Sequence, residues 1–505
     1  MKRVSFHDYP KEPIVIDNLS IKFMKQSRFI PLALDKDTLK IAIADPEDFY
    51  TIDALKLAYG LNVEVREGRE EDIAQAIEKL YGSGTQSLET IIEEAGRDIY
   101  NISPGKEEDA DHLRDLASEA PIIRLVNRLI YNAVEVRASD IHFEPFEDSF
   151  KVRYRIDGVL HEVESPPDRL QAAVISRVKI MAKLDIAERR LPQDGRIKLK
   201  IADKEIDFRV STLPTLFGES LVMRILDRDT LILDLGKLGF PKDVFLNYID
   251  LVSQPYGMVL VTGPTGSGKT STLYTTLAKI NSPENKIITL EEPVEYQLRG
   301  VNQIQVNPKI GMSFANGLRS IVRQDPDIIL VGEIRDRETA EIAIQSALTG
   351  HLLFSTLHTN DAPGAITRLL DMGVESFLLS STLLGVLAQR LVRVICPNCK
   401  EAVKPEEKLI KSMDISPDEA ERIEFFAGKG CEECRYTGFR GRTAIFEYLP
   451  VDGDIRKKIT EKSSTEVIRN QAISKGMLTL RQDGWRKVKE GITTISEVLR
   501  VTLER

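Results

Sequence analysis

A stretch near the middle of the chain has the residue types and spacing of a nucleotide-phosphate site. Gly263, Gly268, Lys269 and Thr270 match G-x-x-x-x-G-K-[ST], between an apolar strand-like run at 258–261 and a helix-like stretch. Glycines let backbone N–H groups converge on phosphates, and the helix N-terminus adds partial positive charge. We expect Lys269 to reach the β- and γ-phosphates and the Thr270 hydroxyl to bind Mg²⁺. The predicted nucleotide-binding residues are Gly263, Pro264, Thr265, Gly266, Ser267, Gly268, Lys269, Thr270 and Ser271.

Hydrolysis also needs carboxylates near the magnesium ion and the attacking water, and two apolar runs end in them. "DIILVGEIRD" places Glu333 at the end of one strand, with Gly332 where an aspartate is common. "IITLEEPVEY" offers Glu291, Glu292 and Glu295 after another strand. Taken alone this is also the pattern of a surface acidic cluster, but its place beside a phosphate loop favours catalysis.

Two histidines stand at the ends of a further apolar strand. "GHLLFSTLHTNDA" contains His351 and His358. An imidazole there would sense the γ-phosphate or bridge subunits. A histidine pair of this kind more often has a structural role, so the residues alone leave both interpretations open.

The four cysteines form two C-x-x-C pairs, Cys396 with Cys399 and Cys431 with Cys434. Two such pairs predict a closed tetrahedral site of four sulfurs, which favours structural Zn²⁺ over a disulfide, a redox pair or an iron–sulfur cluster. The segment "RYTGFRGR" follows the second pair. Its arginines and aromatic residues are compatible with nucleic-acid binding, but a protein-docking or solvated surface is the more common meaning.

Composition places these motifs in a protein of ordinary globular character. The 505 residues are 42% hydrophobic and 29% charged, with a formal net charge of −9, which argues against a main surface that grips nucleic acid. "MKRVSFHDYP" lacks the apolar core of a signal peptide. The longest apolar stretch, "FLLSSTLLGVLAQRLV", is shorter than the ~20 residues that span a bilayer. We therefore predict a cytoplasmic protein that meets membranes only through partners.

The elements that position the motifs follow from periodicity. Short strand and helix patterns alternate at the start of the chain, period-2 strands follow an amphipathic helix from about residue 120, and strands alternate with helices around the phosphate loop. The predicted fold class is α/β, with α+β domains before the nucleotide-binding core. The predicted segments are an α+β domain at 1–81, a linker at 82–117, a second α+β domain at 118–235, the core at 236–391, a tetracysteine zinc module at 392–446 and C-terminal helices at 447–505.

These motifs together resemble a known family, the secretion ATPases that assemble type II secretion pseudopili and type IV pili. The resemblance covers nearly everything from about Ser118 onward. It is carried by "SEAPIIRLVNRLI", "ASDIHFEPFEDSFKVRYRIDG", "LPQDGRI" and "FRVSTLPTLFGESLVMRILDR", and by "GPTGSGKTSTLY", "TLEEPVEY", "RQDPDIILVGEIRD", "GHLLFSTLHTNDA" and the tetracysteine. The first hundred residues match only loosely.

The resemblance implies roles for individual residues. Glu291 to Glu295 correspond to an acidic box in which Glu292 replaces the usual aspartate, and Glu295, supported by Glu291, would polarise the attacking water. Glu333 matches the atypical Walker B glutamate, which follows a glycine in this family. The histidines at 351 and 358 match its histidine box. Arg209 and Arg224 match arginines that the second, PAS-like domain brings to the nucleotide as arginine fingers do.

At the level of the whole protein the resemblance implies a RecA-like core that uses ATP, Mg²⁺ and Zn²⁺ in a homo-hexamer. The motor would be peripheral at the inner membrane, acting on a platform protein and docking a partner's cytoplasmic domain through its N-terminal domain. The resemblance favours type II secretion, with type IV pilus assembly as the alternative. The N-terminal region shows no clear glycine- and leucine-patterned cyclic-dinucleotide module of the kind some pilus motors carry. A nucleic-acid translocase and a non-hydrolysing scaffold are disfavoured by the acidic charge and by the intact nucleotide motifs.

Overall fold

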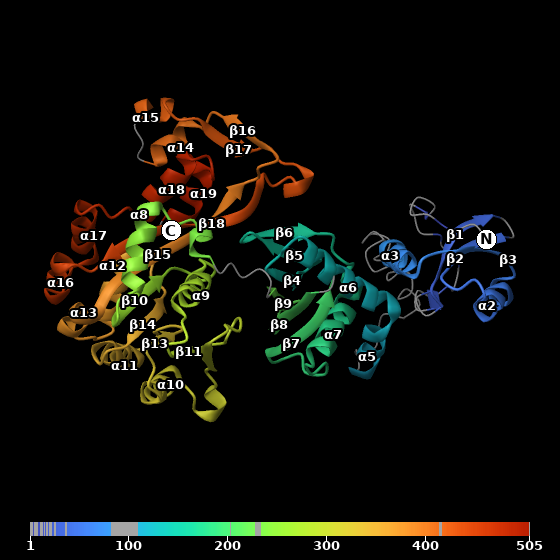
Figure 1. Cartoon of the computed structure of the whole chain (residues 1–505), viewed down its shortest axis with the longest axis horizontal. Coiled ribbons are helices and arrows are strands. Elements are labelled where there is room, and N and C mark those ends of the chain that lie inside the picture. Colours follow the sequence, from blue (N-terminus) through green and yellow to red (C-terminus); the bar gives the residue numbers. More distant parts are fainter. Residues whose placement is uncertain are drawn as a thin grey trace. The chain divides into compact units, whose positions relative to one another are not determined.

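The computed structural model describes residues 27–35, 38–81, 110–201, 204–227, 234–413 and 417–503, with scattered residues among the first 26. The chain forms two compact units, residues 1–227 and 228–505 (Figure 1). Most of the predicted linker at 82–117 lies outside the described residues, and its end falls within a helix, α5 (Ala110–Ser118).

The N-terminal part of the first unit is a small α+β fold with its own core. β1 (Phe29–Asp35) pairs antiparallel with β2 (Thr38–Ile43), which pairs parallel with β3 (Asn62–Glu67). Helices α2 (Phe49–Tyr59) and α3 (Glu70–Tyr81) accompany this sheet. Their apolar residues pack together with the strands in one cluster. This agrees with the α+β pattern that the sequence predicts at 1–81.

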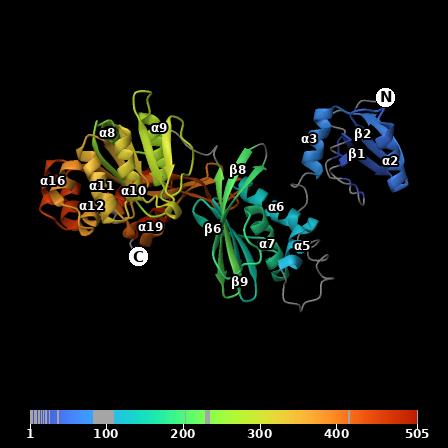
Figure 2. The ribbon, with the colours of Figure 1, turned by 90° about the horizontal axis from the view of Figure 1, so that it is seen from below.

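A six-stranded antiparallel sheet forms the second domain of the first unit, in the order β6-β5-β4-β9-β8-β7. Apolar residues alternate along it and meet α6 and α7 in one core, so one face is buried and the other carries polar side chains. Figure 2 shows the helices on one side of this sheet. The elements are α5, α6 (Ala120–Glu135), β4 (Asp140–Pro145), β5 (Phe150–Ile156), β6 (Val159–Val163), α7 (Gln171–Ala182), β7 (Gln193–Ile201), β8 (Lys204–Thr215) and β9 (Gly218–Asp227).

The second unit is built on a seven-stranded sheet in the order β12-β11-β13-β14-β10-β15-β18. All neighbours pair parallel except β15 and β18, which pair antiparallel. The central strands are buried along their whole length, as expected when helices cover both faces. The strands are β10 (Gly257–Thr262), β11 (Ile287–Glu291), β12 (Val301–Gln305), β13 (Ile328–Val331), β14 (Leu352–Leu357), β15 (Leu383–Ile395) and β18 (Phe439–Pro450).

Helices pack on both faces of this sheet and form two separate cores. One core joins the sheet to α8 and α9, and the other joins it to α10 through α13 together with α16 and α17. This is the doubly covered α/β core that the sequence predicts. The helices are α8 (Lys242–Val252), α9 (Lys269–Ile280), α10 (Phe314–Ile321), α11 (Arg337–Leu348), α12 (Ala362–Asp371), α13 (Ser376–Thr382), α16 (Gly453–Thr460) and α17 (Thr465–Ser474).

The tetracysteine segment is inserted between two strands of the core sheet. The boundaries predicted at 391/392 and 446/447 fall inside β15 and β18, because the long antiparallel pairing of these strands continues the sheet. A further apolar cluster joins these strands to the C-terminal helices. The remaining elements are β16 (Lys400–Val403), α14 (Glu407–Ser412), α15 (Pro417–Glu421), β17 (Phe425–Gly428), α18 (Leu480–Lys489) and α19 (Ile495–Thr502).

Candidate functional site

The phosphate loop leaves the centre of the core sheet and enters α9. β10 lies between β14 and β15, and α9 begins at Lys269. Gly263, Gly266 and Gly268 have φ values of 151°, 78° and 90°, in the region that favours glycine. The glycine spacing therefore serves the backbone path of the loop, as the motif predicts.

The Lys269 side chain lies along the loop. Its Nζ donates to the carbonyl oxygens of Gly263, at 2.7 Å, and Pro264, at 3.1 Å. Burial lowers the pKa of Lys269 to about 8, and although the nearby Glu333 carboxylate opposes this shift, the Arg390 guanidinium adds to it. Thr270, the predicted magnesium ligand, is exposed at the start of the helix.

Glu333 lies just beyond the end of β13, where its carboxylate meets His358. The His358 Nε2 atom is 3.3 Å from one carboxylate oxygen, and the Glu333 side chain is only 17% exposed. A Cβ at Gly332 would lie 3.2 Å from the Leu290 carbonyl oxygen, which makes glycine the natural residue before Glu333. The structure therefore brings together Glu333 of the predicted Walker B motif and His358, one of the two histidines of the histidine motif.

Arg335 links the two acidic segments and is a residue that the motif analysis missed. It forms an ion pair with Glu333 and a second, at 2.9 Å, with Glu292. Its hydrogen bond to Glu333 is the main cause of its raised pKa. The sequence feature that could have identified Arg335 is its position two residues after Glu333, on the same loop. Glu292, which replaces the usual aspartate of the acidic box, thus holds this arginine.

Glu291 is buried, at 5% exposure, and its carboxylate is held by three side chains. It accepts hydrogen bonds from Tyr274 Oη, from Thr289 Oγ1 at 2.6 Å and from Gln303 Nε2 at 3.2 Å. Tyr274 Oη in turn accepts the Glu295 backbone N–H at 3.3 Å. Burial and the Glu291 charge raise the pKa of Tyr274. These contacts place Glu291 as a support for the acidic box, whereas Glu295 is half-buried at its outer end.

The structure separates the two histidines that the sequence pairs. His351 precedes β14 and His358 follows it, so they lie at opposite ends of the strand. The His351 Nδ1 atom is 2.8 Å from the Ser346 carbonyl oxygen at the end of α11. His351 is therefore outside the nucleotide site of its own chain, because a six-residue strand spans ~20 Å. A catalytic role there has no support, and a bridge between subunits stays a prediction.

Arg209 and Arg224 belong to the first unit, where they lie side by side. They are directly paired across β8 and β9, and Arg224 Nε donates to Asp140 Oδ1 at 3.0 Å. The register places Arg196 opposite Arg209, and Arg155 opposite Asp140. One row of basic side chains with a single aspartate thus crosses the polar face of the sheet. Motif matching identified two of these arginines, and strand alternation was the available signal for the others.

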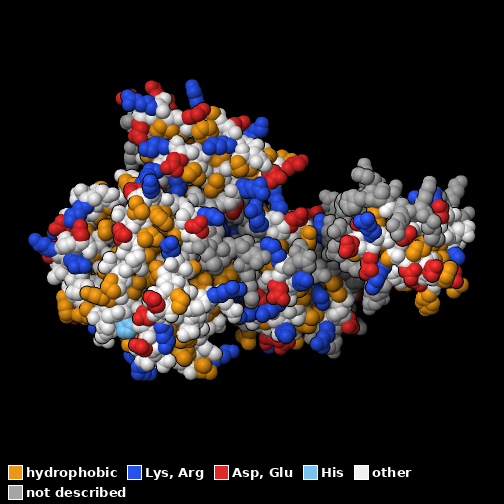
Figure 3. Space-filling view, viewed as in Figure 1, with side chains coloured by type: hydrophobic (Ala, Val, Ile, Leu, Met, Phe, Trp, Pro, Cys, Tyr) orange, Lys and Arg blue, Asp and Glu red, His pale blue; other side chains and the backbone are white. Residues whose placement is uncertain are grey.

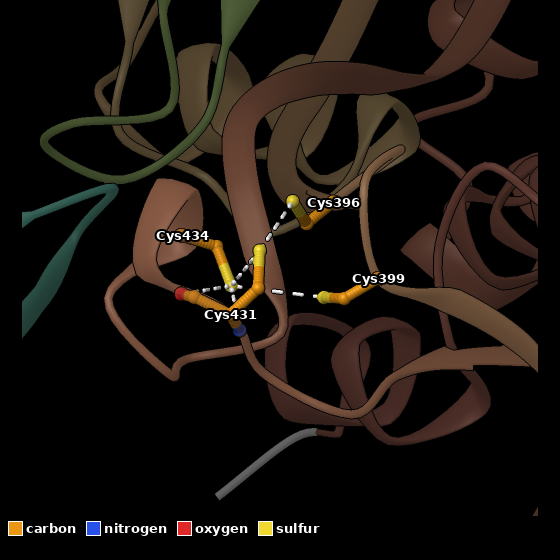
Figure 4. Close-up of side chains that lie close together, drawn as sticks. All are labelled: Cys396, Cys399, Cys431 and Cys434. Atoms are coloured by element: carbon orange, nitrogen blue, oxygen red, sulfur yellow. Dashed lines mark hydrogen bonds between the residues drawn. The ribbon is translucent and has the colours of Figure 1, made fainter.

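The four cysteine sulfurs converge on one point (Figure 4), with every pair of Sγ atoms within 4.8 Å. The Sγ atoms of Cys396 and Cys431 are 3.9 Å apart, and those of Cys399 and Cys434 are 3.7 Å apart. A tetrahedral site with Zn–S bonds of ~2.3 Å requires sulfurs separated by ~3.8 Å. The arrangement therefore fits a zinc ion.

Backbone N–H groups complete the cysteine site, as in metal–thiolate centres. Cys434 Sγ accepts from the backbone N–H groups of Cys431, at 3.2 Å, and Gly438, at 3.3 Å. Burial opposes ionisation, but these bonds lower the pKa of Cys434 to about 6. Burial raises the pKa of Cys399 to about 12. A metal ion would favour the thiolate form of all four.

Two family models match the sequence of this chain. Residues 115–500 match the family model described as "Type II/IV secretion system protein", and residues 1–87 match the model of the MshEN domain. The N-terminal part thus matches a known domain model that the sequence motifs did not reveal, which corrects the expectation that the N-terminal region shows no clear module. Among the helices that the structure describes, none has the length and apolar character to span a membrane.

Two curated relatives cover almost the whole chain. The chain is 53% identical over 498 residues to "Type II secretion system protein E" of Xanthomonas campestris pv. campestris, covering 98% of this chain and 87% of the relative. It is 45% identical over 498 residues to "Type IV pilus assembly ATPase PilB" of Myxococcus xanthus, covering 98% and 88%.

Solved structures share the fold over about three quarters of the chain. The pilus retraction motor PilT with bound ADP is 27% identical, with a TM-score of 0.50 over 74% of this chain and 96% of that one. The ATPase DotB of Legionella pneumophila, 20% identical, has a TM-score of 0.55 over 74% and 94%. The predicted RecA-like fold and ATPase activity are confirmed by these comparisons together with the family match. The chain belongs to the family of type II/IV secretion system ATPases.

Proposed function

We propose that this chain is the ATP-hydrolysing motor of a type II secretion system and powers pseudopilus assembly and protein export. The observation that carries the proposal is the 53% identity to a type II secretion protein E across 98% of the chain. The phosphate loop, Glu333 and the acidic box supply the parts that hydrolysis needs.

The proposed chemistry divides among these residues. Lys269 and the backbone of the phosphate loop hold the phosphates, and Thr270 is a ligand of the Mg²⁺ ion, which neutralises developing charge when bound. Glu295 orients and polarises the attacking water. The carboxylate of Glu333, held by Arg335 and His358, is the second acidic group at this end of the sheet. Glu291 accepts a hydrogen bond from Tyr274, which in turn accepts the Glu295 backbone N–H, and in this way Glu291 positions the acidic box.

The resemblance to the family supports a role for the arginine row of the second domain at the nucleotide. Arg209 and Arg224 stabilise the negative charge of the transferring phosphoryl group, as arginine fingers do. Asp140 orients Arg224 through their 3.0 Å hydrogen bond.

The tetracysteine site binds one structural Zn²⁺. Four sulfur ligands close the coordination sphere, so the ion stabilises the segment between β15 and β18 and takes no part in hydrolysis.

The motor works as a homo-hexamer in the cytoplasm, peripheral to the inner membrane. Its partners are an inner-membrane platform protein and the cytoplasmic domain of a membrane protein, docked by the N-terminal domain. Nucleic acid is not a partner: the net charge is −9, and on the face shown in Figure 3 basic and acidic side chains are interspersed over the second unit. The alternative, type IV pilus assembly, is supported by the 45% identity to PilB, which is lower than the 53% identity to the type II secretion relative.

A deletion strain tests the proposal, with exported proteins in the medium and surface pili scored together. Loss of the exported proteins with intact pili supports type II secretion. Loss of pili with normal secretion supports the pilus alternative. Phosphate release by the purified chain, measured with and without DNA, tests the remaining classes: a translocase requires stimulation by DNA, and a scaffold requires no turnover.

A further inference from the structure

A buried glutamine on β15 contacts the phosphate loop from below. Gln389 is only 2% exposed. β15 runs parallel to β10, with Ala388 opposite Thr262, so Gln389 comes level with the first residue of the loop. Neither the phosphate-loop motif nor the acidic motifs include this residue.

The Gln389 amide uses both of its ends. Nε2 donates to the Ser267 carbonyl oxygen at 2.7 Å, and Oε1 accepts from Thr272 Oγ1 at 2.8 Å. The orientation follows from the partners, because a carbonyl oxygen only accepts a hydrogen bond. One side chain therefore ties the loop to the first turn of α9.

The loop glycines allow this close contact. A Cβ at Gly268 would lie 2.7 Å from Gln389 Nε2, and a Cβ at Gly263 would lie 2.6 Å from the Gln389 carbonyl oxygen. Both glycines also have positive φ values. The loop thus packs against Gln389 at both of its ends.

We propose that Gln389 is a positioning residue that sets the shape of the phosphate loop for ATP. In a trans peptide the C=O and the following N–H point in opposite directions. When Gln389 holds the Ser267 carbonyl on the buried side, the Gly268 N–H points away from Gln389, toward the phosphate side. Gln389 does not touch the nucleotide. It acts through the peptide group that does.

Three substitutions separate this role from a contribution to stability alone. Gln389→Glu keeps an acceptor for Thr272 but loses the donor to Ser267, and Gln389→Leu loses both bonds. Thr276→Val is the matched control. Thr276 is fully buried on the same helix, and its hydroxyl bonds Tyr248 Oη and the Thr272 carbonyl oxygen, away from the loop.

The experiment measures, on the full-length chain, the Kd of a non-hydrolysable ATP analogue with Mg²⁺, and the melting temperature. We expect Gln389→Leu to weaken binding about tenfold, since a buried carbonyl loses its donor. Thr276→Val should lower the melting temperature by a similar amount and change the Kd less than about twofold. Equal Kd values for Gln389→Leu and Thr276→Val would overturn the proposal.

The pH profile of Gln389→Glu gives an independent readout, which also serves if Gln389→Leu does not fold. When the introduced carboxyl group is protonated it can donate to Ser267, and when ionised it repels that carbonyl oxygen. Relative to wild type at each pH, we expect binding about tenfold weaker near pH 8 and recovery toward pH 6. A Kd ratio that does not change with pH would contradict a role of the Ser267 bond.

Discussion

Replacing Glu333 with glutamine should separate ATP binding from ATP turnover. The substitution keeps the size of the side chain and removes its charge. Loss of a carboxylate that acts on the reacting groups costs about 10²–10⁴-fold in rate, or roughly 3–5 kcal/mol of transition-state stabilisation. The Kd for ATP should change less than about threefold, because Lys269 and the loop backbone remain.

The folded state should tolerate this substitution. The ion pairs of Glu333 are with Arg335 and His358, whose side chains are 58% and 52% exposed, and pairs of this exposure contribute only ~0–1 kcal/mol. Since Glu333 raises the pKa of Lys269, its loss lowers that pKa further, so the assay belongs well below pH 8, where protonation of the lysine is favoured.

Phosphate release under single-turnover and steady-state conditions, with analogue binding in parallel, measures both quantities. Glu341→Gln is the matched control, because Glu341 is an exposed carboxylate on α11 that pairs with Arg337. Turnover by folded Glu333→Gln within about threefold of wild type would refute the assignment of Glu333 to the reaction.

Four further predictions concern other parts of the chain. ATP affinity of the wild type should fall as pH rises through about 8, because binding needs protonated Lys269, whose pKa is about 8; a Kd constant from pH 7 to 9 would contradict this. Arg209→Ala and Arg224→Ala should each lower kcat at least about 100-fold with little change in analogue binding, and unchanged kcat would remove them from the site. Treatment with a chelator should release about one zinc ion per chain and expose the backbone amides between β16 and β17 to hydrogen exchange, while ATP binding persists. Loss of ATP binding at the same time would show that the cysteine segment is part of the nucleotide-binding core. Burial raises the pKa of Glu447 to about 7, above its unfolded value, so its contribution to stability is present at pH 4.5 and lost as pH rises through 7. Denaturant titrations of Glu447→Gln should show a flatter dependence of the unfolding free energy on pH in this range, by up to about 3 kcal/mol.

Local motifs made the nucleotide site predictable. The phosphate loop needs glycines and a lysine at fixed spacing, and the apolar runs before Glu291 and Glu333 form adjacent buried strands, β11 and β13. Their carboxyl ends meet because parallel strands share an edge of the sheet. Strand alternation also predicts the polar face on which Arg209 and Arg224 lie.

Contacts between distant segments could not be predicted in the same way. Gln389 meets Ser267 across 122 residues, and the largely apolar strand β15 also carries Arg390 and Arg393, so no local pattern marks Gln389. The apolar run between His351 and His358 predicts a strand, but it does not predict that His351 contacts the end of α11. Likewise, β18 joins the core sheet through its antiparallel pairing with β15. Because the cysteine segment separates these two strands in the sequence, no local pattern predicts their pairing.

The most direct test of the central claim joins the chemistry to the biology in one strain. The chromosomal gene is replaced by the wild-type, Glu333→Gln or Glu341→Gln form, and exported proteins and surface pili are measured at equal levels of the chain. We expect the Glu333→Gln chain to accumulate normally and to abolish export while pili stay intact, and the Glu341→Gln strain to behave as wild type. Normal export by the Glu333→Gln strain would contradict the claim that ATP turnover at this site drives secretion.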